Sequence, residues 1–269
     1  MIKNETMTLH SVGLYSSWCL KKNFRLLFDC GDGCAQILKK QIFAVENIFF
    51  SHAHVDHVAG LFSFIGLRNK TMGANDKELN IYYPENEILF LEYKAFAEKL
   101  FPKKFLKFDL NWYPIKAGDE IYVRKKNYVK SFKTKHNANS LGYVVCEESR
   151  RLKEEYSEKD IGKLIKEKKV SREDITERAD IKHFAYTLDN CGFDLNLIKG
   201  VKEVVLDATF IDPRDRTSMT HCTFDEAKKI ADELECEIAY LAHISPRYKD
   251  YREKIYTTYI KQKKEKRLN

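Results

Sequence analysis

The clearest chemical signal in the chain lies in residues 51–57, whose sequence is SHAHVDH. Three histidines and one aspartate fall within this segment, although the 269 residues of the chain include only 8 histidines. Imidazole nitrogen and carboxylate oxygen are the ligand atoms that zinc accepts in catalytic sites. His52 and His54 alternate on one side of an extended turn, whereas Asp56 and His57 point elsewhere as a helix begins. The segment therefore predicts ligands for two adjacent cations, in preference to surface polar residues that meet by chance.

One loop supplies too few ligands for two cations, so the others must come from distant parts of the chain. His136 and His243 each close a run of residues typical of a strand, and Asp189 follows the apolar run 184–188. In α/β folds, side chains at the carboxyl ends of strands gather at one edge of the sheet. Taken singly, each of these residues is equally explained as an ordinary hydrogen-bonded polar group. Together with segment 51–57, they favour a metal site.

The elements that must position these residues alternate between short strands and helices. Glycines at positions 31 and 33 predict a turn after the first strand. The pattern predicts helices at 35–40, 58–68, 87–100 and 224–234, and strands at 24–28, 47–50, 81–83, 107–113, 120–123, 129–134, 141–146, 184–188, 204–207 and 236–241. Few prolines and glycines interrupt it, which indicates a single domain over residues 1–269. A charged helical insertion is expected at about 147–183, and a basic, helical tail from about 250.

Composition limits the class of protein. Hydrophobic residues make up 43% of the chain and charged residues 32%, which suffices for a buried core and argues against disorder. No run approaches the roughly 18 apolar residues of a membrane span, and the first ten residues lack the apolar core of a signal peptide. The 7 cysteines are scattered, as expected for reduced thiols. We therefore expect a cytoplasmic protein without a membrane partner.

The net charge of +7 is unevenly distributed. Residues 103–135 contain ten Lys or Arg and three acidic residues, hence +7, and residues 249–269 contain eight and three, hence +5. Basic surfaces of this kind attract phosphate polymers. A solvated, lysine-rich surface explains the same charge equally well, so charge alone leaves nucleic-acid binding open.

These motifs together resemble the metallo-β-lactamase superfamily and, within it, the ribonuclease Z family of tRNA 3′-processing endonucleases. The resemblance covers about residues 26–248, and the insertion is most similar to the short, plant-type branch of the family. The His-x-His-x-Asp-His pattern is typical of the superfamily. The segments that resemble ribonuclease Z are FKTKH at 132–136 with SLGY at 140–143, DATF at 207–210 in place of EATF, HCT at 221–223 and HISPRY at 243–248.

The resemblance implies a four-layer αββα sandwich and two zinc ions, with manganese as the alternative metal. His52, His54 and His136 would bind one ion. Asp56, His57 and His243 would bind the other, and Asp189 would bridge the two. At this last position the family reads Gly-Asp-Thr, whereas residues 188–190 of this chain read Leu-Asp-Asn.

The resemblance also implies catalytic roles. His221 would be the catalytic histidine, oriented by Asp207, although a histidine before residue 224 is also explained as a helix cap. Asp56 would assist proton transfer as well as bind metal. Ser140 and Arg247 are candidates for contact with the substrate phosphate.

The expected function is that of a zinc-dependent phosphodiesterase, most similar to a homodimeric endoribonuclease that processes precursor tRNA through a metal-bridging hydroxide. Two departures weaken the tRNA prediction: residues 10–18 lack the family's Gly-Thr-x-x-x-x-Pro loop, and the insertion lacks a Gly-Pro-rich arm. A phosphodiesterase for cyclic nucleotides on the same scaffold is the alternative. A metal-free RNA-binding protein and a thioester or lactam hydrolase are less favoured.

Overall fold

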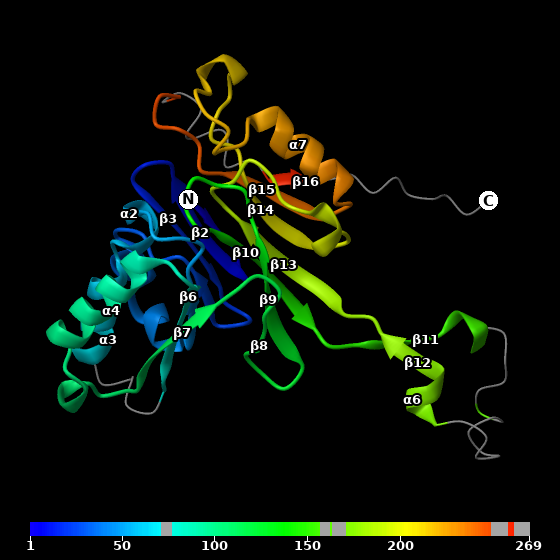
Figure 1. Cartoon of the computed structure of the whole chain (residues 1–269), viewed down its shortest axis with the longest axis horizontal. Coiled ribbons are helices and arrows are strands. Elements are labelled where there is room, and N and C mark those ends of the chain that lie inside the picture. Colours follow the sequence, from blue (N-terminus) through cyan, green and yellow to red (C-terminus); the bar gives the residue numbers. More distant parts are fainter. Residues whose placement is uncertain (71–76, 157–161, 163–170, 249–257, 261–269) are drawn as a thin grey trace.

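The protein folds into two seven-stranded sheets that pack face to face (Figure 1). The computed structural model describes residues 1–70, 77–156, 162, 171–248 and 258–260. The first sheet has the order β1 (Ile2–Lys3), β2 (Met7–Val12), β3 (Ser16–Lys21), β4 (Leu26–Phe28), β5 (Asn47–Phe49), β6 (Leu79–Pro84) and β7 (Leu110–Ile115). The second has the order β16 (Thr258–Ile260), β15 (Ile238–Ala242), β14 (Glu203–Asp207), β13 (Ile181–Thr187), β10 (Leu141–Glu147), β9 (Asn127–Lys133) and β8 (Glu120–Tyr122).

Helices cover the outer faces of both sheets. In Figure 1, α3 and α4 lie against the first sheet and α7 against the second, which confirms the expected αββα sandwich. The α-helices are α1 (Cys34–Leu38), α2 (Val55–Val58), α3 (Leu61–Lys70), α4 (Ile88–Leu100), α6 (Arg172–Ile175) and α7 (Phe224–Glu233). The 3₁₀ helices are η1 (Lys39–Ala44), η2 (Lys103–Phe105), η3 (Glu154–Tyr156), η4 (Leu195–Leu197) and η5 (Pro213–Asp215). Within the described ranges, no helix has the length and apolar character to cross a bilayer.

Apolar side chains fill three layers of core. The inter-sheet layer is aromatic: the Phe28 ring lies 5.3 Å from the Tyr186 ring and 5.5 Å from the Phe184 ring. A second cluster lies under α1, α3 and α4, and a third under α7. Strands of the interior are buried on both faces, which explains why they read as continuous apolar runs in the sequence.

Most strands that lead to the predicted ligands have parallel neighbours, whereas β9, which precedes His136, is antiparallel to β8 and β10. In the first sheet β4, β5, β6 and β7 are parallel neighbours, and in the second β13, β14 and β15 are. Their carboxyl ends therefore meet at one edge of the sandwich. The loops that follow β5, β13 and β15 carry His52, Asp189 and His243.

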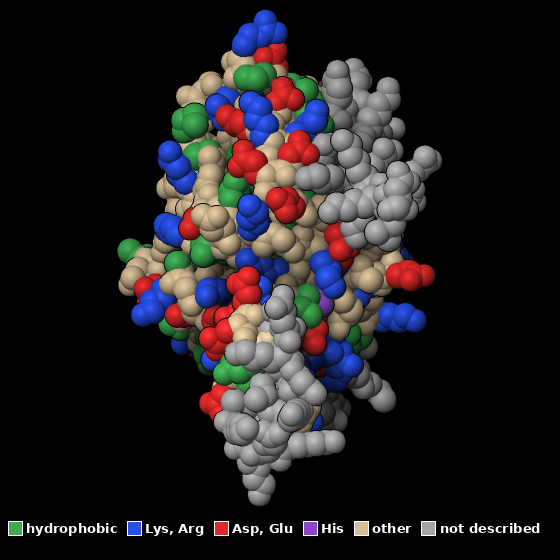
Figure 2. All heavy atoms as spheres, turned by 90° about the vertical axis from the view of Figure 1, so that its right-hand side faces the viewer, with side chains coloured by type: hydrophobic (Ala, Val, Ile, Leu, Met, Phe, Trp, Pro, Cys, Tyr) green, Lys and Arg blue, Asp and Glu red, His purple; other side chains and the backbone are tan. Residues whose placement is uncertain are grey.

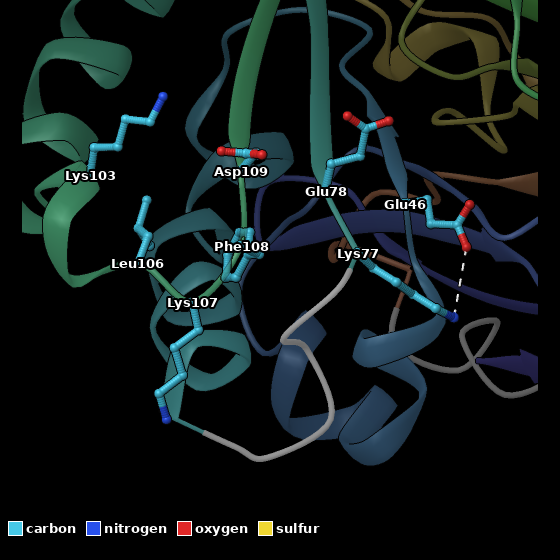
Figure 3. A pocket seen from close by; sticks show the side chains of 8 residues that line it. All are labelled: Glu46, Lys77, Glu78, Lys103, Leu106, Lys107, Phe108 and Asp109. Atoms are coloured by element: carbon cyan, nitrogen blue, oxygen red, sulfur yellow. Dashed lines mark ion pairs between the residues drawn. The ribbon is translucent and has the colours of Figure 1, made fainter.

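A separate cavity of about 660 Å³ lies at the amino ends of β5, β6 and β7 (Figure 3). Glu46, Glu78 and Asp109, which precede β5, β6 and β7, line it together with Lys77, Lys103 and Lys107. The cavity therefore lies at the opposite end of the parallel strands from the predicted metal ligands.

The predicted elements differ from the structure in the insertion and at both ends of the chain. The insertion was expected to be helical, and it does contain the short helices η3 and α6, but β11 (Arg150–Leu152) and β12 (Thr176–Arg178) pair into an arm that projects from the sandwich (Figure 1). Figure 2 views the molecule from the side on which this arm projects. Most of the helix expected between β11 and β12 lies outside the described residues. In the tail, residues 258–260 pair with β15 as a strand, so the expected helix is wrong there. The strands β1, β2 and β3 were not predicted.

Glycines allow the loops at the metal edge to touch backbone to backbone. A Cβ atom added at Gly31 would lie 2.3 Å from the carbonyl oxygen of Asp56 and 2.7 Å from the backbone nitrogen of Ser17. A side chain at this position would force apart the turn after β4, the start of β3 and the loop that holds Asp56. Gly66 in α3 contrasts with it, since its added Cβ would lie 3.4 Å from the Phe101 ring.

We predict that Gly31→Ala lowers the free energy of unfolding by at least about 3 kcal/mol, because backbone atoms cannot move aside cheaply. Gly66→Ala is the control and should raise it by about 0.5–1 kcal/mol, as expected for alanine in a helix. Urea unfolding with a chelator present measures both without a contribution from bound metal. An equal effect of the two substitutions would contradict the role of Gly31.

Candidate metal centre

The seven predicted ligands converge at the metal edge as two overlapping sets. In each set the potential ligand atoms lie within 4.8 Å of one another, and the carboxylate of Asp189 belongs to both. The first set consists of His52, His54, His136 and Asp189. The second set consists of Asp56, His57, Asp189 and His243. The structure therefore places residues from four separate segments of the chain around two neighbouring points.

The first set is built from imidazole nitrogens. Nδ1 of His54 lies 2.9 Å from Nε2 of His52 and 3.3 Å from Nε2 of His136. Oδ2 of Asp189 lies 3.7 Å from Nε2 of His52. His54 thus presents Nδ1 to the centre, whereas the other two rings present Nε2.

The second set is built around carboxylates. The Nε2 atoms of His57 and His243 each lie 3.2 Å from an oxygen of Asp189 and 3.5 Å from Oδ2 of Asp56. Among the described residues, Nε2 of His57 and Oδ1 of Asp189 are buried without a hydrogen-bond partner. Buried polar atoms are rarely left in that state. The donor set and these two atoms therefore fit a pair of divalent cations such as zinc.

A second layer of hydrogen bonds orients the rings. In four of the five histidine rings, the nitrogen that faces away from the centre has a partner 2.7–3.0 Å away. These partners are Ser51 Oγ for His52, Asp29 Oδ2 for His57, the Thr220 carbonyl for His136 and Thr209 Oγ1 for His243. Such partners set the tautomer and the angle of a ligating histidine.

Asp29 is a site residue that the sequence analysis missed. Its buried carboxylate accepts hydrogen bonds from the Ser51 hydroxyl, the Tyr186 hydroxyl and Nδ1 of His57. The backbone N–H of Ser51 donates to it as well, so Asp29 ties the end of β4 to the first ligand loop. The available signal was its position, because Asp29 directly follows β4, much as Asp189 lies two residues beyond β13.

Burial and local charge set the ionisation of the ligands. Burial and the neighbouring charge of His57 lower the pKa of His52, which favours the neutral ring that binds metal. Burial raises the pKa of Asp189, but the charges of His243 and His57 outweigh it and hold this pKa well below its usual value. The shared carboxylate therefore stays ionised, as a metal ligand requires.

His221 and Asp207 form a pair beside the second set. Nδ1 of His221 lies 2.8 Å from Oδ2 of the buried Asp207, and the His221 ring stacks on the His243 ring at 5.1 Å. Burial lowers the pKa of His221, but the hydrogen bond and the charge of Asp207 outweigh it and raise this pKa to about 9. His221 is thus held as a protonated acid near neutral pH, next to the metal centre.

The alternative role of His221 as a helix cap does not apply. Thr223 is the N-cap of α7, and its side chain accepts a hydrogen bond from the backbone N–H of Glu226. His221 is therefore available for chemistry.

Ser140 and Arg247, the two candidates for contact with the substrate phosphate, differ in their exposure. Ser140 is fully buried and its hydroxyl bonds to that of Thr134 at 2.7 Å, so it cannot reach a substrate, contrary to expectation. The half-exposed guanidinium of Arg247 pairs with Asp215 at 3.3 Å and lies over the Phe210 ring. Contact between Arg247 and a phosphate stays a prediction.

Comparisons with known proteins agree with this geometry. A model described as the beta-lactamase superfamily domain matches residues 24–244. The chain is 30% identical over 251 residues to a ribonuclease Z from Archaeoglobus fulgidus, covering 83% of this chain and 79% of that protein. It is also 30% identical to a tRNase Z from Arabidopsis thaliana, covering 88% and 84%. Among solved structures, the short form of human tRNase Z aligns with a TM-score of 0.66 at 18% identity, covering 90% and 93%.

Thr209 offers a test of the second layer. Its hydroxyl lies 2.6 Å from Oδ1 of Asp207, which can only accept, and 2.9 Å from Nδ1 of His243. The Thr209 hydroxyl therefore donates its proton to Asp207, and Nδ1–H of His243 must donate to the Thr209 oxygen. In this tautomer Nε2 of His243 carries no proton, so its lone pair can bind metal. We predict that Thr209→Val, which keeps the shape, weakens zinc binding by about 10–100-fold.

Competition with a chromophoric chelator would measure this affinity without reference to activity. Thr209→Ser keeps the hydroxyl and should bind zinc as the wild type does. Wild-type affinity in the valine variant would refute the proposed role of the hydroxyl.

Proposed function

This chain belongs to the ribonuclease Z family of the β-lactamase superfamily, and from that premise we propose that it is a two-zinc endoribonuclease that processes the 3′ end of precursor tRNA. The family makes it a phosphodiester hydrolase. The observation that carries the proposal is the sharing of Asp189 between two ligand sets, with His221 adjacent to both. Two zinc ions bound there would act as Lewis acids toward a phosphoryl oxygen and would let water ionise near neutral pH.

His221 would act on the leaving group. Asp207 accepts from Nδ1 and so fixes the ring, which leaves the Nε2 proton free to be donated to the 3′ oxygen as the phosphodiester bond breaks. A pKa of about 9 keeps most of the ring protonated at neutral pH, so the proton is in place before the reaction begins.

Asp56 would assist at the attacking side. Burial raises its pKa, but the hydrogen bond to His243 and the charge of His57 outweigh it and lower the pKa. The carboxylate is therefore ionised, and its side chain is 11% exposed, so that one oxygen can accept a proton from attacking water while the other faces the cation.

The arm favours RNA as the substrate. The hairpin β11–β12 projects from the sandwich, and a long substrate could reach it together with the metal edge. Its reach carries this argument and its charge does not, because Arg151 pairs with Glu177 and Arg178 pairs with Glu120 and Asp180. A cyclic nucleotide is too small to bridge the metal edge and this arm, and no feature of the described residues favours it specifically.

The metal, the oligomeric state and the cellular compartment are further proposals that rest on the same family. We propose zinc over manganese because imidazole dominates the first ligand set. A homodimer is proposed from the resemblance, and the exposed apolar side chains of α4, among them Leu89 and Phe96, suit such an interface. All seven cysteines are free thiols, in keeping with a reducing cytoplasm.

We predict that the purified chain cleaves precursor tRNA on the 3′ side of the discriminator nucleotide and that His54→Ala lowers kcat more than about 100-fold, because one ligand of the first set is lost. The control is His183→Ala, since His183 lies outside the metal centre and pairs with Glu147. A chelator should abolish cleavage, and added zinc or manganese should restore it. Hydrolysis of cyclic AMP or cyclic GMP in place of any precursor tRNA would replace this proposal with the alternative.

We further predict that Asp207→Asn changes the pH dependence. A general acid works only while protonated, so kcat of the wild type should fall as pH rises through about 9. Without the charge of Asp207, burial dominates, and this falling limb should move toward the usual histidine value of about 6.5 or below. Asp225→Asn on the exposed side of α7 is the control. An unshifted limb with unchanged metal content would exclude His221 as the acid.

A further inference from the structure

The hairpin between β2 and β3 lies at the rim of the second ligand set. Gly13 approaches His243 so closely that an added Cβ would lie 3.0 Å from its carbonyl oxygen and 3.4 Å from its ring. The Gly13 N–H donates to the carbonyl of Ile244, the residue that follows this ligand. One side of the hairpin is therefore anchored directly on the loop of His243.

The other side of the hairpin is anchored on the turn after β4, which packs against α2, the helix that holds Asp56. The Ser16 hydroxyl donates to the carbonyl of Asp32 at 2.7 Å, and the neighbouring Gly31 packs against both Ser16 and the backbone of Asp56. α2, which contains Asp56, also contacts β3, as Figure 1 shows. The hairpin is thus fixed between two ligand loops of the second set.

Only Leu14 and Tyr15 lie between the two anchor residues, Gly13 and Ser16. Leu14 is 76% exposed and Tyr15 is 64% exposed, so neither side chain serves the core. Leu14 also adopts a φ of 70°, a left-handed conformation that is unfavourable for a leucine. Strained, exposed residues held rigidly beside a reactive centre are typical of contacts to a ligand.

A third apolar side chain completes the rim. Val55 lies between the ligands His54 and Asp56 and is 68% exposed. It begins α2, the helix that contacts β3. The mouth of the metal centre therefore has an apolar border with one aromatic ring, in a protein whose proposed substrate is otherwise bound by charge.

We propose that Leu14 and Tyr15 form a stacking platform for the unpaired nucleobase next to the scissile phosphodiester of an RNA substrate. This inference rests on the proposed function. RNA-binding proteins recognise unstacked bases by stacking them on aromatic rings, and every base has a face that can stack. The platform positions the nucleotide beside the second ligand set. Tyr15 is a binding and positioning residue, and the proton transfers remain with His221 and Asp56.

Steady-state kinetics on the zinc-loaded full chain test the platform. The variants are Tyr15→Ala, Tyr15→Phe and Leu14→Ala. Phe105→Ala is the matched control, because Phe105 is 65% exposed but belongs to η2, near the cavity at the amino ends of the strands. The substrates are precursor tRNA, the same RNA with an abasic nucleotide on either side of the scissile bond, and bis(p-nitrophenyl) phosphate, a diester without a base.

For Tyr15→Ala we expect KM for precursor tRNA to rise about 5- to 150-fold, equivalent to about 1–3 kcal/mol for one base–aromatic stack. The kcat should change little, since the stack forms before and during the reaction. Tyr15→Phe should keep the wild-type KM, and Leu14→Ala should show a smaller rise. The effect of Tyr15→Ala should vanish with the abasic RNA on one side of the bond, which identifies the stacked nucleotide. Hydrolysis of bis(p-nitrophenyl) phosphate should be unchanged.

Two results would overturn the platform alone. One is an unchanged KM for precursor tRNA in Tyr15→Ala, and the other is an equal loss on bis(p-nitrophenyl) phosphate, which would mean that the ring only supports the fold. If the wild-type chain hydrolyses bis(p-nitrophenyl) phosphate but no precursor tRNA, the proposed function fails and the platform with it. Quenching of 2-aminopurine at the identified nucleotide, lost in Tyr15→Ala and kept in Tyr15→Phe, gives a readout of stacking that is independent of turnover.

Discussion

A single buried carboxylate, that of Asp189, faces imidazole nitrogens of three histidines at distances of 3.2–3.7 Å. Taking charged and strongly polar groups out of water in this way is costly unless they are paired or bind a metal. The two ligand sets divide the surrounding nitrogens and oxygens between two points, and Asp189 alone belongs to both. The rest of the structure holds these ligand groups together, although removing them from water is unfavourable.

The sandwich supplies that support from two directions. Parallel strands of both sheets deliver their carboxyl ends to the same edge, and polar groups behind the ligands then orient four of the five histidine rings. Asp207 serves several of these needs at once, since it bonds His221, Thr209 and the backbone N–H of Asn190, the residue after Asp189. His221, the candidate metal ligand His243 and the shared carboxylate of Asp189 are therefore coupled through one side chain. A substitution at any of these three residues is therefore expected to perturb the position of the other two.

Two separate surface features would serve the proposed RNA substrate. The hairpin at the rim presents apolar side chains to a base, and stacking would give that base a defined position. The arm joins the amino end of β13, away from the metal edge, so only a long substrate could contact both. The cavity at the amino ends of β5, β6 and β7 (Figure 3) lies at the other end of the strands and is part of neither feature.

The sequence by itself predicted the ligand types and the strands that lead to them, and its family resemblance predicted the fold class. Three histidines and an aspartate in one short segment are too dense for chance, and continuous apolar runs mark buried strands. Tertiary structure alone decided the second layer. Asp29 and Thr209 matter through contacts with residues 28 and 34 positions away, and no local pattern records such a contact. Burial likewise excluded Ser140 from the substrate, and pairing with β15 made residues 258–260 a strand. The platform at Tyr15 also depends on tertiary structure, because only packing against the loops of Asp56 and His243 places an otherwise ordinary hairpin beside the reacting centre.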